Sequence, residues 1–189
     1  MSSALAAEPH GGPYTIGDLF MLPDDGKRHE LIEGSILVSP PPAFAHQVAA
    51  GRLRALLAAA VPEDVEVVEA IGIRVSENVL IPDVVVARAE VLYGGGKLLD
   101  PADTLAVVEI ASPSNRYKDS LLKSAMYAEA GIEAFWRVEP ETPRVVVFNL
   151  TEDHEYAEVA RAGAGETLEV ARPFPVSFDP AELSGPVRR

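Results

Sequence analysis

Apolar residues in this chain fall into short continuous runs and into longer stretches with helical spacing. The run from Leu105 to Ala111 is almost wholly apolar and carries one carboxylate, Glu109. Such a short apolar run is typical of a strand that is buried on both faces of a sheet. A second run, from Ile81 to Ala87, carries Asp83 close to its start. The pattern therefore predicts two buried strands, each with one acidic side chain.

Three stretches have the spacing of helices. Residues 16–21 predict a short helix, because Thr15 and Asp18 stand at the positions of a capping box. Residues 43–60 predict an amphipathic helix that ends before Pro62. Residues 117–130 predict a second long helix, which Gly131 ends. The apolar positions expected to define the buried side of the 43–60 helix are Phe44, Val48, Leu53, Leu56 and Leu57.

The remaining apolar runs predict strands. Residues 29–32 and 35–39 read as a hairpin that turns at Glu33-Gly34. The segment 173–178 is expected at a sheet edge, because its prolines cannot donate to a ladder. Other strands are expected at 65–70, 71–75, 79–87, 134–138, 144–148, 156–160 and 167–170. The predicted fold class is α/β (α+β), with a mixed central β-sheet flanked by helices and an additional β-hairpin.

Composition narrows the class of protein. A length of 189 residues with 48% hydrophobic and 24% charged residues fits one globular domain. We expect a flexible N-terminal arm over residues 1–13, a single domain over 14–183 and a tail over 184–189. No apolar run approaches the roughly 20 residues that span a bilayer, and the first residues lack a basic signal-peptide start. A cytoplasmic protein without a membrane partner is therefore expected.

Charge and cysteine content bear on the chemistry. The net charge of −13 counts against broad non-specific binding of nucleic acid, which depends on Lys and Arg. It leaves room for a local basic groove, or for a site in which a metal supplies the positive charge. The chain has no cysteine, which excludes disulfides, thiolate zinc sites and cysteine nucleophiles.

Asp83 and Glu109 are the candidate metal ligands. An ionised Glu on a buried strand costs several kcal/mol, roughly, unless a cation or hydrogen-bond donors meet it. The 26 positions between the two acids allow their strands to be neighbours. Carboxylate oxygens without cysteine favour Mg²⁺ or Mn²⁺ over zinc. Simpler interpretations are a structural carboxylate paired with arginine or backbone donors for Glu109, and a turn residue for Asp83.

Lys123 is the candidate ammonium group. It follows Glu109 by 14 residues and lies within the predicted 117–130 helix. Asp119 and Tyr127 are its neighbours at four residues on either side, so the three side chains share one face of that helix. An ammonium near the metal would orient a water molecule or stabilise a transition state. The competing interpretation is a solvated lysine that is paired with Asp119, worth only about 0.5 kcal/mol.

Several short motifs occur in a fixed order along the chain. They are Tyr14-Thr-Ile-Gly-Asp-Leu, Leu22-Pro-Asp-Asp-Gly, His29-Glu-Leu-Ile-Glu-Gly, Ser39-Pro with His46, Ile81-Pro-Asp-Val-Val-Val, Val107-Val-Glu-Ile-Ala-Ser-Pro-Ser, Asp119 with Lys123 and Tyr127, and Gly131-Ile-Glu-Ala-Phe-Trp. Taken in this order, the motifs resemble the Uma2 family, a branch of the PD-(D/E)xK restriction-endonuclease-like superfamily. The resemblance covers about residues 14 to 180, and the order of the motifs is more specific than any one of them.

The resemblance implies a restriction-endonuclease-like core and a metal-dependent phosphodiesterase site. Asp83 matches the first acidic ligand of the family and Glu109 the second, while Glu30 matches a glutamate that adds a ligand or a hydrogen bond. The superfamily pattern places lysine two positions after the second acid, where this chain has Ala111. The lysine role is therefore assigned to Lys123 on the following helix.

The resemblance also implies a nucleic-acid partner, with DNA expected ahead of RNA, and by analogy a homodimer. His46 is expected near the mouth of the site, where a neutral imidazole can serve as a base. Ser112 belongs to a segment that is most simply a helix cap, although its backbone donors suit a phosphate. Two other functions remain open: a non-catalytic interaction module with the same fold, and a phosphohydrolase acting on small nucleotides.

Overall fold

The structure is a computed structural model that describes residues 11–111 and 118–185, with the backbone alone for residues 118–120. It contains four α-helices, two 3₁₀ helices and twelve strands within these residues. The α-helices are α1 (Ile16–Met21), α2 (Phe44–Ala58), α3 (Ala89–Tyr93) and α4 (Lys118–Glu129). The 3₁₀ helices are η1 (Pro101–Asp103) and η2 (Pro180–Leu183). The strands are β1 (Arg28–Ile32), β2 (Ser35–Ser39), β3 (Val65–Glu69), β4 (Ile73–Val75), β5 (Asn78–Leu80), β6 (Val84–Arg88), β7 (Thr104–Ile110), β8 (Ala134–Glu139), β9 (Arg144–Leu150), β10 (Tyr156–Gly163), β11 (Leu168–Val170) and β12 (Val176–Phe178).

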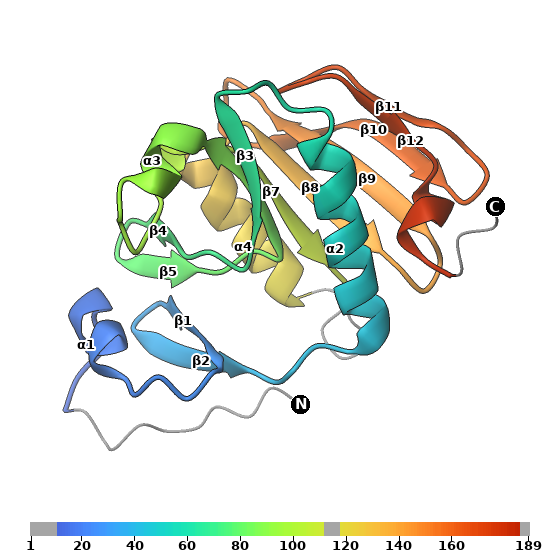
Figure 1. Cartoon of the computed structure of the whole chain (residues 1–189). Coiled ribbons are helices and arrows are strands. Elements are labelled where there is room, and N and C mark those ends of the chain that lie inside the picture. The colour runs from blue at the N-terminus through green and yellow to red at the C-terminus, as the bar shows by residue number, and fades with distance from the viewer. Residues whose placement is uncertain (1–10, 112–117, 186–189) are drawn as a thin grey trace.

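A six-stranded sheet in the order β10-β9-β8-β7-β6-β3 forms the centre of the molecule. Strands β7 and β8 are parallel, and every other neighbouring pair is antiparallel. The parallel pair requires a crossover connection, and α4 lies in that connection. In Figure 1, α2 lies in front of this sheet and α4 behind it. The mixed central sheet flanked by helices is therefore confirmed.

The predicted hairpin forms part of a separate, smaller sheet. Strands β1 and β2 pair in an antiparallel register that turns at residues 33–34, as expected. Strands β5 and β4 extend this sheet, which has the order β2-β1-β5-β4. Strands β11 and β12 form a third, two-stranded sheet. The hairpin lies at the lower left of Figure 1, beside α1.

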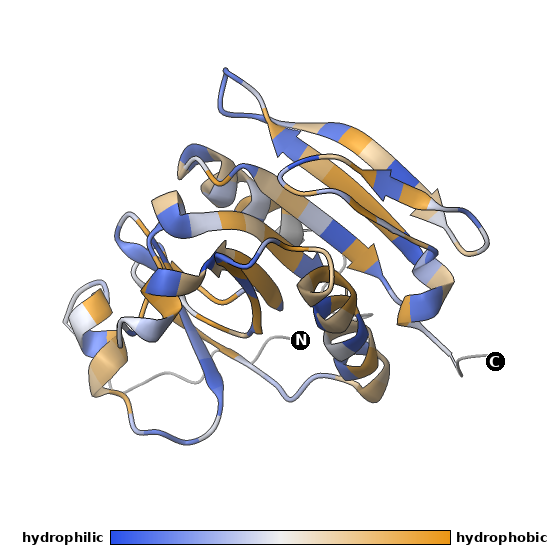
Figure 2. Ribbon diagram, turned by 45° about the horizontal axis from the view of Figure 1, so that its top comes forward, coloured by the Kyte–Doolittle hydropathy of each residue, from blue (hydrophilic) through white to orange (hydrophobic). Residues whose placement is uncertain are grey.

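Hydrophobic residues cover both faces of the central sheet. The face toward α2 packs Trp136 with Leu53 and Leu57, and the face toward α4 packs Phe135 with Tyr127. Trp136 is 1% exposed and Phe135 is 4% exposed, so both belong to the core. In Figure 2 the strands in the middle of the sheet are mostly hydrophobic along their length. Burial on both faces explains why these strands read as continuous apolar runs.

One predicted strand is two strands in the structure. The run 79–87 divides into β5 and β6, which belong to different sheets. The chain leaves the smaller sheet at Ile81, whose backbone N–H donates to the Glu30 carboxylate at 2.7 Å. The next residue, Pro82, has no N–H to continue a ladder. The break places Asp83 at the entrance to β6.

The buried side of α2 differs from the expected one. Leu53 and Leu57 are buried as predicted, but Phe44 is 92% exposed and Val48 is 44% exposed. Close to the sheet the helix instead places small residues, Ala49 and Ala50, and the imidazole of His46. The prediction from the apolar pattern was wrong at these positions. Small residues allow the helix to approach the sheet closely, and Phe44, in the first turn of the helix, stays outside that contact.

The predicted ends of two helices are confirmed. Thr15 and Asp18 form the capping box of α1. Gly131 has φ +83°, a conformation that favours glycine, two residues after the last residue of α4. The helix α3 was not predicted from the sequence. Among the described helices, none combines the length and the apolar character needed to cross a membrane.

Candidate active site

Asp83 and Glu109 lie at the same end of two neighbouring strands. The pairing of β6 with β7 ends at Val84 and Val108, so Asp83 comes immediately before the pair and Glu109 immediately after it. The backbone N–H of Asp83 donates to the carbonyl oxygen of Val108 at 3.0 Å, which holds this end of the pairing together. Alternation along β7 puts Glu109 on the same face as Val107, the face toward α4, whereas Asp83 lies at the end of the sheet within reach of His46 on α2.

The Asp83 carboxylate is almost fully buried, with the residue 5% exposed. Arg28 Nη1 donates to its Oδ1 at 2.8 Å, and the backbone N–H of Ile110 donates to its Oδ2 at 2.8 Å. His46 Nε2 lies 3.2 Å from Oδ2. Burial by itself would raise the pKa of Asp83, but these three donors outweigh it and hold the pKa below its usual value. Asp83 is therefore a carboxylate at neutral pH.

Glu109 and Glu30 share a cation. Lys123 Nζ lies 2.7 Å from Oε1 of Glu30 and 3.4 Å from Oε1 of Glu109. The hydroxyl of Tyr127 donates to the same Glu109 oxygen at 2.9 Å. Glu30 is itself 5% exposed and accepts the N–H of Ile81. Three segments that are far apart in sequence thus bring their charges to one place.

Lys123 is not a solvated surface residue. Its side chain is 13% exposed and faces Glu30 and Glu109. Burial would lower its pKa, but the charges of Glu109 and Glu30 outweigh that effect and raise the pKa above its usual value. Lys123 therefore stays protonated at neutral pH. The side chain of Asp119, which the simpler interpretation made its partner, lies outside the described residues.

Glu109 has a pKa that is displaced toward neutral pH. Burial raises its pKa, Lys123 lowers it, and the nearby negative charges of Asp83 and Glu30 raise it again, to about 7. The hydroxyl of Tyr127 also favours the charged form. Tyr127 remains a phenol, because burial and the carboxylates of Glu109 and Glu30 raise its own pKa well above the usual value. Glu109 can therefore gain or lose a proton near neutral pH.

The raised pKa of Glu109 predicts a pH-dependent stability. In metal-free buffer the folded protein binds this proton up to about pH 7, whereas the unfolded chain releases it near pH 4.5. Between these values the folded state holds more protons, so the free energy of unfolding falls as pH rises. Urea unfolding of wild type and Glu109→Gln should show the fall in wild type only. The same pH slope in both proteins would contradict the assignment.

The structure brings most of the predicted site residues together. Asp83, Glu109, Glu30 and Lys123 converge, and His46 and Tyr127 contact members of this group. Ser112 lies outside the described residues. The sequence analysis missed Arg28, which contacts Asp83 directly. Its position two residues before Glu30 in one strand was a usable signal, because alternate residues of a strand share a face.

The oxygen donors of the cluster suit a hard divalent cation. Asp83 and Glu109 offer carboxylate oxygens from neighbouring strands, and such oxygens fit Mg²⁺ or Mn²⁺. The described hydrogen bonds of the Glu109 side chain all reach Oε1. Within residues 11–111 and 118–185 no three His, Cys, Asp or Glu side chains are grouped closely enough to hold a metal ion. A cation here would therefore rest on two carboxylates, with water or substrate oxygens as its other ligands.

Comparisons with known proteins bear on the family and the fold. The family model Uma2, described as "Putative restriction endonuclease", matches residues 17–184. A crystal structure of a "putative nuclease belonging to DUF820" from Anabaena variabilis ATCC 29413 is similar in fold, with a TM-score of 0.70 and 17% sequence identity. The similarity covers 90% of this chain and 97% of the other chain. A search of curated proteins found no match.

Proposed function

Because the chain belongs to the Uma2 family, we propose that it is a metal-dependent endonuclease that hydrolyses phosphodiester bonds of DNA. Asp83 and Glu109 would hold Mg²⁺ or Mn²⁺, and Lys123 and Glu30 would complete the site. A divalent cation bound there lowers the pKa of water and neutralises charge on a phosphate. The remaining tasks in catalysis would be carried out by the protein's own side chains.

Each side chain has a task that follows from its contacts. Lys123 carries a fixed positive charge beside Glu109, where it can stabilise charge that develops on a phosphate oxygen. Glu30 holds the ammonium of Lys123 in place at 2.7 Å. Arg28 and the N–H of Ile110 orient the Asp83 carboxylate. Lys123 and Tyr127 hold the Glu109 carboxylate through its Oε1, and this carboxylate would contribute a ligand oxygen to the cation.

One observation carries the proposal. Lys123 comes from a helix, 14 residues after Glu109, and yet its Nζ lies between two acids on two other segments. A lysine with no role at the site would be expected in solvent, since long charged side chains are rarely buried without a partner. The arrangement supplies the acid, acid and lysine groups of a nuclease site, although the lysine is displaced along the sequence.

A substrate panel tests the proposal. The full-length protein would be incubated with plasmid DNA, linear duplex DNA, single-stranded DNA, RNA and mononucleotides, each in Mn²⁺, Mg²⁺ or EDTA. We expect cleavage of DNA in the presence of either metal and none in EDTA. Hydrolysis of mononucleotides but not of nucleic acid would instead indicate a small-nucleotide phosphohydrolase. Inactivity on every substrate would favour a non-catalytic module.

A further inference from the structure

A row of arginines crosses the central sheet next to Glu109. In the parallel register, Glu109 on β7 is beside Arg137 on β8. Arg137 pairs with Val146 on β9, which in turn pairs with Arg161 on β10. Arg144, two residues before Val146 on β9, points to the same face by alternation. This face is the one toward α4, because Phe135 and Phe148 of the same strands pack there. We call Arg137, Arg144 and Arg161 the arginine row.

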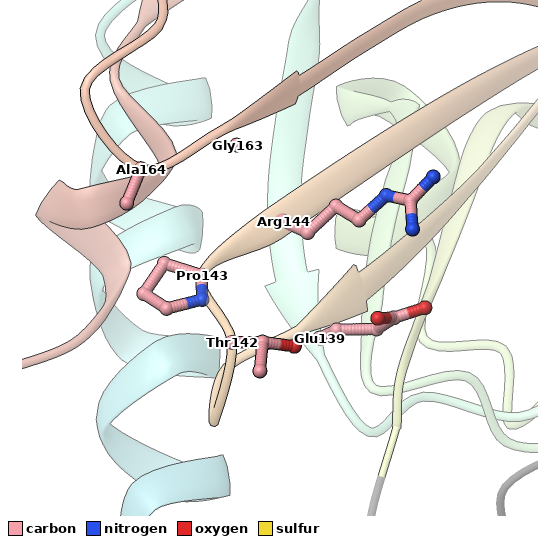
Figure 3. Close-up of a pocket in the computed structure, with 6 residues that line it drawn as sticks. All are labelled: Glu139, Thr142, Pro143, Arg144, Gly163 and Ala164. Carbon is pink, nitrogen blue, oxygen red and sulfur yellow. The ribbon is translucent and has the colours of Figure 1, made fainter.

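The side chains of the row are partly exposed. The side chain of Arg137 is 28% exposed and that of Arg161 is 57% exposed. Arg144 lines a shallow hollow with Glu139 and the turn at Pro143. Figure 3 shows the side chains of Arg144 and Glu139 extending to the same side of their strands. The row therefore presents three cations from adjacent strands to solvent.

The three arginines act on one carboxylate. Arg161 donates two hydrogen bonds to Glu158. These bonds lower the pKa of Glu158, and the charges of Arg161, Arg144 and Arg137 lower it further. A second acid near the row, Glu139, has its Oε1 3.6 Å from Nε of Arg137, a separation longer than a hydrogen bond. Arg137 Nε is buried and makes no hydrogen bond among the described residues. Glu139 and Glu158 thus only partly neutralise the three arginines, and Glu109, which lies beside Arg137, is itself paired with Lys123.

This excess of positive charge stands out in a chain with a net charge of −13. Resting on the proposed function, we propose that the arginine row binds the sugar-phosphate backbone of the DNA strand that enters the Glu109 site. Guanidinium groups match phosphate oxygens with two parallel N–H donors. The acidic remainder of the surface would repel DNA elsewhere, so the row also sets the direction in which the strand lies.

The dimensions of the row suit this role. Neighbouring strands are about 4.8 Å apart, so three steps from β7 to β10 cover about 14 Å. Each strand of duplex DNA carries one phosphate per about 3.4 Å of helix axis. The row is therefore longer than the spacing of successive phosphates, so its arginines can reach more than one phosphate beyond the one at Glu109. A purely structural role explains less, because exposed ion pairs contribute little to stability.

Binding measured without cleavage tests the row. Fluorescence anisotropy of a labelled DNA duplex would be recorded with the full-length protein in EDTA, over about 50–200 mM salt. We expect Arg144→Gln and Arg161→Gln each to reduce the slope of log K against log salt by about 0.9, the value for one phosphate contact. For a variant that has lost one phosphate contact, the fall in affinity over this salt range should therefore be about 3.5-fold smaller than for wild type.

Matched variants separate the row from general charge effects. Arg54, also exposed and ion-paired, lies on α2 on the other side of the sheet, so Arg54→Gln should leave the slope unchanged. Removing an acid that neutralises the row should have the opposite effect on DNA affinity, so Glu158→Gln should tighten binding. Glu63→Gln, in the exposed loop after α2, should leave the affinity unchanged. The salt slope of Arg137→Gln would be interpreted only if the melting temperature of this variant matches that of wild type.

The outcomes distinguish the row from the proposed function. If wild type cleaves DNA but Arg144→Gln and Arg161→Gln leave the salt slope unchanged, the proposed role of the arginine row is wrong. The nuclease proposal then stands. Binding with reduced slopes, but without cleavage in Mn²⁺, would support the row and overturn the nuclease. Wild-type binding that does not depend on salt would also overturn the row.

Discussion

Replacement of Asp83 by asparagine is expected to remove metal-dependent cleavage of DNA. The amide keeps the shape of the side chain but loses the negative charge that would attract the cation. Substitution of a group that merely orients a metal ligand costs about 10- to 100-fold, so loss of a direct ligand should cost at least about 100-fold. The measurement is the initial rate of plasmid cleavage in Mn²⁺.

Asp103→Asn is a suitable control for this variant. Asp103 is also an aspartate near an arginine, since Arg88 Nε lies 3.9 Å from its Oδ1, but it is remote from Glu109. We expect its cleavage rate to equal that of wild type. Full activity of Asp83→Asn would exclude Asp83 as a ligand, provided that circular dichroism shows the variant to be folded.

Substitution of Lys123 by methionine is expected to reduce both stability and cleavage. Methionine approximates the length of the lysine stem, so the main change is loss of the charge that faces Glu30 and Glu109. Breaking a buried ion pair costs about 3–5 kcal/mol because it leaves an unpaired charge. The free energy of unfolding in urea should therefore fall by about 3 kcal/mol. Cleavage should fall by about 100-fold or more, as when a transition-state donor is removed.

Two further variants test the origin of that loss. Lys97→Met removes an exposed lysine that lies over the ring of Phe20, and it should change stability by no more than about 0.5 kcal/mol. In a double variant, Glu109→Gln should recover part of the stability lost in Lys123→Met, because it removes one of the unpaired charges. A stability of Lys123→Met equal to wild type would contradict a role for this ammonium in holding the acids together.

The central strands and the main helices could be predicted because the information is local. The apolar run around Glu109 specifies a strand buried on both faces, and Thr15 and Gly131 mark the ends of helices by their own chemistry. The need of Glu109 for a cation was also predictable, because a buried carboxylate without a partner is costly. Lys123 could be assigned as that cation only with the help of the family resemblance.

The errors arose where the outcome depends on distant partners. The side of α2 that is buried depends on how closely the helix approaches the sheet, and the alanines that allow this carry little hydrophobic signal. The break at Pro82 depends on Glu30, 51 residues from Ile81, whose N–H it accepts. Arg28 meets Asp83 only because two sheets come together at that point. The arginine row likewise appears only when the register of four strands is known.

The most direct test of the two-carboxylate site is thermal melting in Mn²⁺ and in EDTA, for wild type and Glu109→Gln. A ligand present at 100 times its dissociation constant stabilises the folded state by about 2.7 kcal/mol. For a chain of this length that corresponds to a rise of about 5–10 °C. The account predicts such a rise for wild type and little or none for Glu109→Gln. An unchanged melting temperature for wild type, or an equal rise in both proteins, would contradict it.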